Sequence, residues 1–190
     1  MINNSYLNEQ TINKVRELFF SNKDFPSIKL QNFLDKQFYA QLTQEILNSK
    51  YKKAVKPMQY SYSVPKTPKT LAQFISSKQL KNYISRIISK KIKNINGRMY
   101  RFEWKDYTLL HDKNTEKEGF DFILDFTDNW DEKADGRIIY TDGKGSYNYI
   151  PSLPNTLTII HRKKDFQKFV QYINHYSNNS KRCLFIGLLE

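Results

Sequence analysis

The sequence predicts an α+β fold, in which helices come first and antiparallel strands follow. Up to about residue 97, apolar residues recur every three or four positions, which is the period of an amphipathic helix. From Arg98 onward, apolar and polar residues alternate as in half-buried strands, and turn-forming segments separate about seven or eight such runs. Many short strands of this kind indicate a sandwich, jelly roll or barrel, with the helices packed against one of its sheets.

Three amphipathic stretches make up the helical half. The first is residues 11–20, "TINKVRELFF". The second follows Asp35, which is placed to cap it, and carries its apolar stripe between positions 38 and 46. The third runs from about Leu71 until "NING" ends it. Between the last two, residues 55–70, "VKPMQYSYSVPKTPKT", contain three prolines and are expected to form a loop or an edge segment.

The strand half begins with "YRFEW" and "FDFILDF", in which aromatic and polar residues alternate. It continues with "GRIIYTD", "SYNYI", "TLTIIH", "FVQYI" and "RCLFIGLL", and turn residues lie between these runs. The change of period near Gly97 is a change of element type. We therefore expect a helical extension over residues 1–26 and one main domain over residues 27–190, with helices to about 97 and a β core over 98–190.

The amino-acid composition limits the functions that the chain can have. The 13 Phe, 13 Tyr and 2 Trp supply a large core, and a formal charge of +12 predicts attraction to nucleic acid or to an acidic protein. The abundance of Lys, Asn, Ile and Tyr is equally typical of an AT-rich genome. The chain has no apolar run long enough to span a membrane, and its first residues, "MINNSYLNEQ", lack the apolar stretch expected of a signal peptide. Its single cysteine, Cys183, excludes a disulfide framework. A cytoplasmic protein is expected; oligomeric state is not set by these patterns.

Familiar catalytic motifs are absent, since the sequence holds no P-loop, dinucleotide glycine fingerprint, zinc-finger spacing or nucleophile elbow. The candidate that remains is His111 with Asp112, at the end of the strand-like run in "YTLLHDKN". The pair is either two turn residues or the start of a metal site. The metal interpretation requires a second nitrogen donor from another strand.

The order of the segments resembles that of the 2-oxoglutarate and Fe(II)-dependent oxygenases of the prolyl 4-hydroxylase-like type. "IKLQNFLDKQFYAQLTQEI" and "FISSKQLKNYISRIISKKI" are similar to the entry strand and helices of that family. "YRFEWKDYTLLHD" is similar to the strand that carries the first iron ligands, and "FDFILDFTDNWDEKADGRIIYTD" and "SYNYIPSLPNTLTII" to the strands after it. "QKFVQYINHYSNNSKRCLFIGLL" occupies the place of the distal-histidine and co-substrate-arginine strands. The resemblance covers residues 27–190.

The resemblance implies a double-stranded β-helix, or jelly roll, with an N-terminal helical layer. It also implies Fe(II) held by two histidines and a carboxylate, 2-oxoglutarate as co-substrate, and hydroxylation of a substrate C–H bond. His111 and Asp112 would be metal ligands in this interpretation, and His161 or Gln167 would complete the set.

The co-substrate residues follow from the same resemblance. Arg182 would bind the distal carboxylate of 2-oxoglutarate, because a guanidinium group suits a carboxylate. Tyr100 and Tyr107 would reach toward the same co-substrate.

Two departures from the family pattern open an alternative. Asp112 follows His111 directly, whereas the family has one residue between its first ligands, and Gln167 or Lys168 stands where the distal histidine belongs. The chain is therefore either a hydroxylase of a protein, peptide or nucleic-acid-associated substrate, or a catalytically inactive oxygenase-fold module that binds nucleic acid or an acidic protein partner. A different metal held with help from Glu116 or Glu118 is a third hypothesis. Lys168 pointing into the centre of the barrel would favour the binding module.

Overall fold

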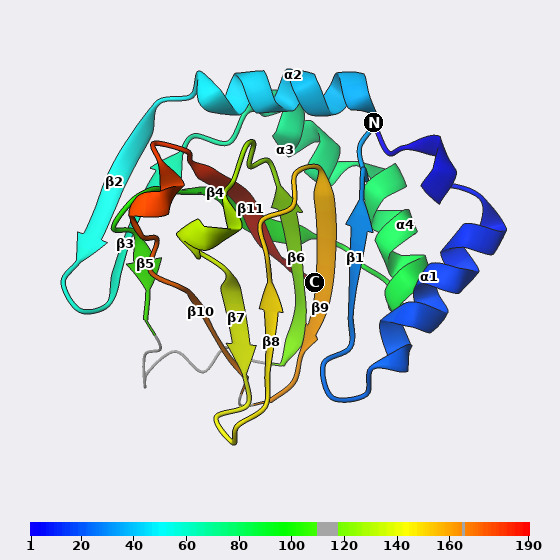
Figure 1. The fold of residues 1–190 in the computed structure, drawn as a ribbon. Helices are drawn as coiled ribbons and strands as arrows, with labels where there is room; N and C mark the ends of the chain where they lie inside the picture. Colours follow the sequence, from blue (N-terminus) through cyan, green and yellow to red (C-terminus); the bar gives the residue numbers. More distant parts are fainter. Residues whose placement is uncertain (110–117, 165) are drawn as a thin grey trace.

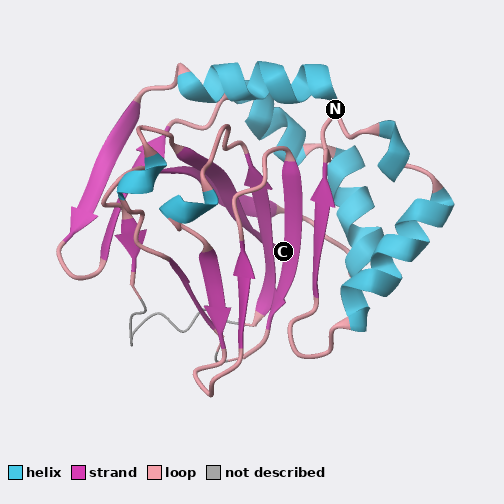
Figure 2. Cartoon of the chain, in the orientation of Figure 1, coloured by secondary structure: helices cyan, strands magenta, loops and turns pink. Residues whose placement is uncertain are grey.

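Four α-helices lie along one side of a large sheet (Figures 1 and 2). The computed structural model describes residues 1–109, 118–164 and 166–190. Asn8, Asp35 and Ser77 accept hydrogen bonds from the first turns of the helices that follow them, and Asp35 does so from Phe38 as predicted. None of the described helices is long and apolar enough to cross a membrane. The helices are α1 (Glu9–Ser21), α2 (Lys36–Leu47), α3 (Lys69–Ser76) and α4 (Lys78–Ile88).

The strands form two antiparallel sheets. The large sheet has the order β1-β9-β6-β11-β4-β3-β2, with β5 paired to β3, and the small sheet has the order β10-β7-β8. The strands are β1 (Ser27–Gln31), β2 (Tyr51–Lys56), β3 (Tyr60–Pro65), β4 (Ile95–Phe102), β5 (Tyr107–Thr108), β6 (Gly119–Asp125), β7 (Ile138–Thr141), β8 (Tyr147–Ile150), β9 (Thr156–Arg162), β10 (Gln167–Val170) and β11 (Arg182–Leu189).

Alternation along the strands builds two apolar cores. On β11, Cys183 and Phe185 belong to the helix-side core, which lies between the large sheet and the helices. Leu184, between them in sequence, belongs to the inter-sheet core, which lies between the two sheets. The double-stranded β-helix with a helical layer is therefore confirmed.

Three details differ from the sequence-based expectation. Residues 55–70 contribute to a β-hairpin of β2 and β3. Their prolines lie at the turn and at the strand end, so the alternating run Tyr60–Val64 contains none. The stretch from Leu71 is two helices, since Ser77 is extended and caps α4. The strand expected from Arg98 is β4, which begins at Ile95, and three strands of the same large sheet, β1, β2 and β3, come before it in the sequence.

The N-terminal segment packs onto the rest of the chain. Ile12, Val15 and Phe19 of α1 belong to the helix-side core together with Ile84 and Ile87 of α4. Residues 1–26 therefore bury their apolar face against the domain that was expected to begin at residue 27.

Candidate functional site

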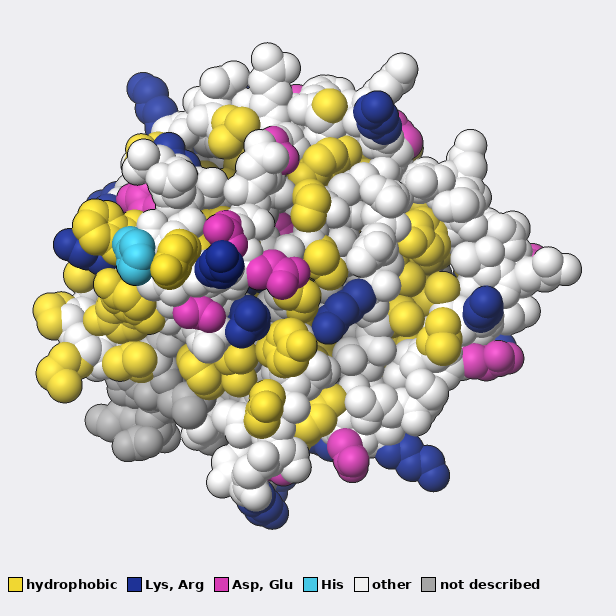
Figure 3. Space-filling view, in the orientation of Figure 1, with side chains coloured by type: hydrophobic (Ala, Val, Ile, Leu, Met, Phe, Trp, Pro, Cys, Tyr) yellow, Lys and Arg dark blue, Asp and Glu magenta, His cyan; other side chains and the backbone are white. Residues whose placement is uncertain are grey.

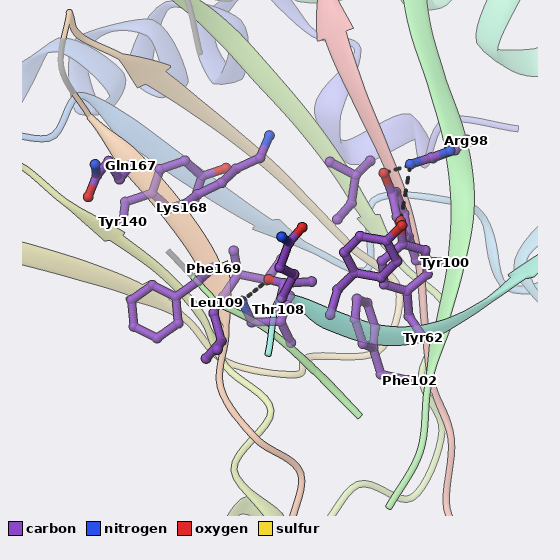
Figure 4. A pocket seen from close by; sticks show the side chains of 15 residues that line it. Tyr62, Arg98, Tyr100, Phe102, Thr108, Leu109, Tyr140, Gln167, Lys168 and Phe169 are labelled. Carbon is purple, nitrogen blue, oxygen red and sulfur yellow. Dashed lines mark hydrogen bonds between the residues drawn. The ribbon is translucent and has the colours of Figure 1, made fainter. Parts of the chain in front are cut away.

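A cavity of about 460 Å³ opens between the two sheets. Its inner part is formed by residues of the inter-sheet core, among them Phe102, Ile138 and Tyr140. Figure 4 shows its two walls, with Tyr62, Tyr100 and Arg98 from β3 and β4 on one side and Lys168 from β10 on the other. We call this cavity the barrel pocket.

Lys168 points into the space between the sheets. It lies opposite Tyr140 in the β10–β7 pairing, and the side chain of Tyr140 is fully buried in the inter-sheet core. The Lys168 ammonium donates a 3.1 Å hydrogen bond to Oδ2 of Asp121 on β6. Tyr140 donates a 2.7 Å bond to the same oxygen, and Arg162 from β9 donates to the other. Asp121 and Arg162 are buried, so Lys168 is one of two cations held on a single buried carboxylate.

Arg98 lies on the opposite wall of the barrel pocket. Its Nε donates a 2.8 Å hydrogen bond to the hydroxyl of Tyr100, and its guanidinium carbon is 4.9 Å from the centroid of the Tyr100 ring. A longer contact of 3.5 Å joins its Nη2 to the hydroxyl of Tyr62. The hydrogen bond to Tyr100 raises the pKa of Arg98 above its ordinary value, so the group carries its charge at every physiological pH.

Arg182 lies at the other end of the barrel. It faces Phe102 in the β11–β4 pairing, whereas Arg98 faces Ile186, so the two arginines are four residue positions apart, roughly 13 Å. Its guanidinium is fully buried and donates to the backbone carbonyls of Gly136, Ile150 and Pro151. Burial lowers the pKa of Arg182 and raises that of Asp125, 3.7 Å away. The Arg182 guanidinium group therefore links the backbone around residue 136 to that of residues 150–151.

The other predicted site residues are dispersed. His161 faces the helices, because Leu157 and Ile159, whose alternation it shares, belong to the helix-side core. There it stacks on Phe120 with ring centroids 4.7 Å apart and contacts Glu118 at 3.2 Å. The structure therefore places His161 on the face of β9 opposite to the barrel pocket.

Two more of the predicted residues lie close to the barrel pocket. Gln167 is at its edge, with its amide directed away from Lys168 (Figure 4). The ring of Tyr107 lies near that of Tyr172, with centroids 6.4 Å apart. His111, Asp112 and Glu116 lie outside the described residues.

The described residues do not fit Fe(II). Among residues 1–109, 118–164 and 166–190, no group of three His, Cys, Asp or Glu side chains could hold a metal ion. The strand that the resemblance assigns to the distal histidine is β10, and it presents Lys168 to the interior. A protonated lysine has donors only and no lone pair for a metal. Asp121, the nearby carboxylate, already accepts bonds from Lys168, Arg162 and Tyr140.

A family comparison identifies the chain. The family model described as "Oxoglutarate and iron-dependent oxygenase degradation C-term" matches residues 52–186. The chain belongs to this family. A search of curated proteins found no match to this member of the oxygenase degradation C-terminal family.

Solved structures agree on the fold of this oxygenase degradation C-terminal domain. A Pseudomonas putida prolyl-4-hydroxylase matches with a TM-score of 0.69 at 12% identity, covering 94% of this chain and 97% of that one. A Trichoplax adhaerens prolyl hydroxylase in complex with a hypoxia inducible factor peptide fragment matches with 0.68 at 12%, covering 95% and 90%. A Burkholderia pseudomallei 2OG-Fe(II) oxygenase family protein matches with 0.69 at 9%, covering 96% and 92%. At such low identity these likenesses concern the fold alone.

Sequence reasoning missed three charged residues of this oxygenase degradation domain. Asp121 and Arg162 are buried, and Arg98 lines the barrel pocket. A signal existed for Asp121, since it is a carboxylate within the otherwise apolar run "GFDFIL". Arg162 ends β9, where charged residues are common, and Arg98 lies among other polar residues in "INGRMYRF", so neither carries such a signal.

Proposed function

We propose that this chain is a protein-binding module of the oxygenase fold, which recognises an acidic partner and does not use iron. The observation that carries the proposal is the Lys168–Asp121 contact of 3.1 Å on the interior side of β10. An ammonium group at this place adds positive charge where a divalent cation would need ligands, and it occupies the nearest buried carboxylate.

The charge of the protein supports an acidic partner. The chain has a formal charge of +12, and Arg98 and Lys168 add positive charge on both walls of the barrel pocket. On the face drawn in Figure 3, the basic side chains that are coloured are scattered among acidic and apolar ones and form no continuous stripe. A stripe is the usual footprint of a nucleic-acid site, so the charge pattern of this face favours a protein partner. The Trichoplax prolyl hydroxylase in complex with a peptide fragment is a precedent in the same fold.

The test of the proposal has two parts. Incubated anaerobically with Fe(II) and then with 2-oxoglutarate and oxygen, the protein should form no succinate, whereas an active prolyl hydroxylase run in parallel should. In fluorescence anisotropy, a labelled oligoglutamate peptide should bind more tightly than a single-stranded oligonucleotide of equal charge and than the matching oligoglutamine peptide. Succinate formation, or tighter binding of the oligonucleotide, would overturn the proposal.

A second candidate is the iron-dependent hydroxylase, and membership of the family is the observation that favours it. It requires His111 and Asp112 to act with a further donor such as Gln167 or His161, and Arg182, Tyr100 and Tyr107 to bind 2-oxoglutarate. Stoichiometric Fe(II) uptake that is lost on substitution of His111 by Ala would support it.

A further inference from the structure

Arg98 is a preoriented cation at the mouth of the barrel pocket. The hydroxyl of Tyr100 fixes its Nε at 2.8 Å, and the Tyr100 ring lies beneath the guanidinium group. No described carboxylate forms an ion pair with Arg98, and its hydrogen-bond partners are the two phenols of Tyr62 and Tyr100. The guanidinium group is exposed, so its other N–H groups remain available to a ligand that enters from solvent.

Lys168 places a second positive charge at the same opening. Arg98, Tyr100, Lys168 and Ile186 together line both the barrel pocket and the smaller hollow beside it, so the two cations face one continuous space. Figure 4 shows them on opposite walls, with the aromatic side chains between and below. An anion at this opening would be attracted by both groups, in a partly enclosed site where screening by water is reduced.

Apolar surface continues inward from these cations. Phe102 and Ile138 of the inter-sheet core line the barrel pocket beyond the Tyr62 and Tyr100 rings, and Ile186 lies opposite Arg98 on β11. This arrangement suits a carboxylate that is carried on a short apolar stem, because the stem can be buried while its charged end stays with the guanidinium group. A phosphate or a polyanion would leave the apolar part of the pocket unused.

We propose that Arg98, oriented by Tyr62 and Tyr100 and assisted by Lys168, binds a carboxylate group with a short apolar stem. This site is distinct from the co-substrate position predicted at Arg182, which begins β11 four residue positions before Ile186, the partner of Arg98, and donates to backbone carbonyls. A free aliphatic diacid and a glutamate side chain of a partner protein share this chemistry. Only the second source rests on the proposed function.

Isothermal titration calorimetry measures the binding of glutarate, glutaramide and a short glutamate-containing peptide to the wild-type protein and to two variants. Arg98→Gln removes the cation, and Arg16→Gln removes an exposed arginine of α1 as a charge-matched control. We expect Arg98→Gln to weaken carboxylate binding by about ten-fold or more, Arg16→Gln to leave it unchanged, and glutaramide not to bind. Thermal melting of each variant checks that it is folded, and Tyr62→Phe, which removes one orienting hydroxyl, should give a smaller loss.

The outcomes separate the two sources. Arg98-dependent binding of glutarate assigns the site to a small acid, and Arg98-dependent binding of the peptide alone assigns it to a protein partner. Peptide binding that Arg98→Gln leaves unchanged overturns this inference and leaves the proposed function standing. No binding of either carboxylate overturns the inference, and the oligoglutamate measurement then decides the proposed function separately.

Discussion

Lys168 on β10 donates a 3.1 Å hydrogen bond to Asp121 on β6, so a cation and a carboxylate join the two sheets at the interior of the barrel. We predict that Asp121→Asn lowers the free energy of unfolding by about 3 kcal/mol, because it removes the buried negative charge that Arg162 and Lys168 share. Lys168→Met should cost less, about 1 kcal/mol, because Lys168 is 20% exposed and Asp121 keeps Arg162. Urea denaturation measures both.

The control for this pair is Lys164→Met, which removes an exposed lysine from the turn before β10. It should change stability by less than about 0.5 kcal/mol. A stability of Asp121→Asn equal to that of the wild-type protein would contradict the structural role given to the cluster.

Asp106 anchors the β2–β3 hairpin. It is fully buried, and Lys53 donates to both of its oxygens at 2.6 and 2.8 Å, while Ser61 and the backbone N–H of Glu103 also donate to it. We predict that Asp106→Asn destabilises the protein by about 2–3 kcal/mol, because an amide NH₂ then faces these donors. Hydrogen exchange should quicken first in residues 51–65.

The matched control for the hairpin is Asp128→Asn, the same chemical change at an exposed aspartate. It should leave both stability and exchange unchanged. Equal protection of residues 51–65 in Asp106→Asn and in the wild-type protein would count against the anchor.

Arg182 gives a test between a structural and a co-substrate role. We predict that Arg182→Lys lowers the free energy of unfolding by about 3 kcal/mol, because the single ammonium nitrogen of lysine replaces two guanidinium nitrogens that donate to carbonyls of separate segments. Arg98→Lys, the same change on the neighbouring strand, should have little effect on stability. If Arg182→Lys were as stable as the wild-type protein, the guanidinium group would be dispensable to the fold and free for a ligand.

Cys183 provides a pH-dependent prediction. Burial raises the pKa of its thiol from 9.0 to about 12. The folded-state pKa lies above that of the unfolded chain, so the native thiol keeps its proton at pH values where the unfolded chain has lost it. The stability that the buried neutral thiol contributes is fully present below about pH 9 and is lost as the pH rises through about 12. This loss amounts to roughly 4 kcal/mol at most. The native thiol should resist alkylation at neutral pH and react once the chain is unfolded in urea.

The alkaline effect is isolated by Cys183→Ala. Stability should fall less steeply between about pH 9 and 12 in the variant than in the wild-type protein. Identical slopes would show that other groups, such as Tyr39, whose pKa burial raises to about 12, account for the alkaline loss.

The sequence predicted most of the fold and little of the barrel pocket. Alternation in runs such as "FDFILDF" defines which side chains are buried, and the burial of apolar side chains is the main driving force of folding, so the jelly-roll core could be predicted. The β2–β3 hairpin was missed because prolines there suggested a loop, although they fall where they spare the strand. His161 shares its alternation with Leu157 and Ile159, but alternation alone does not show which of the two cores that face of β9 contacts.

The sequence by itself determined that this protein has an α+β architecture with a strand-rich C-terminal half, a strong positive charge and no familiar catalytic motif, whereas the expected order of helices before strands was wrong for β1, β2 and β3. Only the tertiary structure decided that Lys168 contacts Asp121, that Arg182 donates to backbone carbonyls, and that Arg98 lines an open pocket. The physical reason is the distance along the sequence over which each signal acts. Periodicity and turn chemistry are local properties of the chain, whereas these contacts join residues 31 to 47 positions apart, or depend on which strands become neighbours in the two sheets.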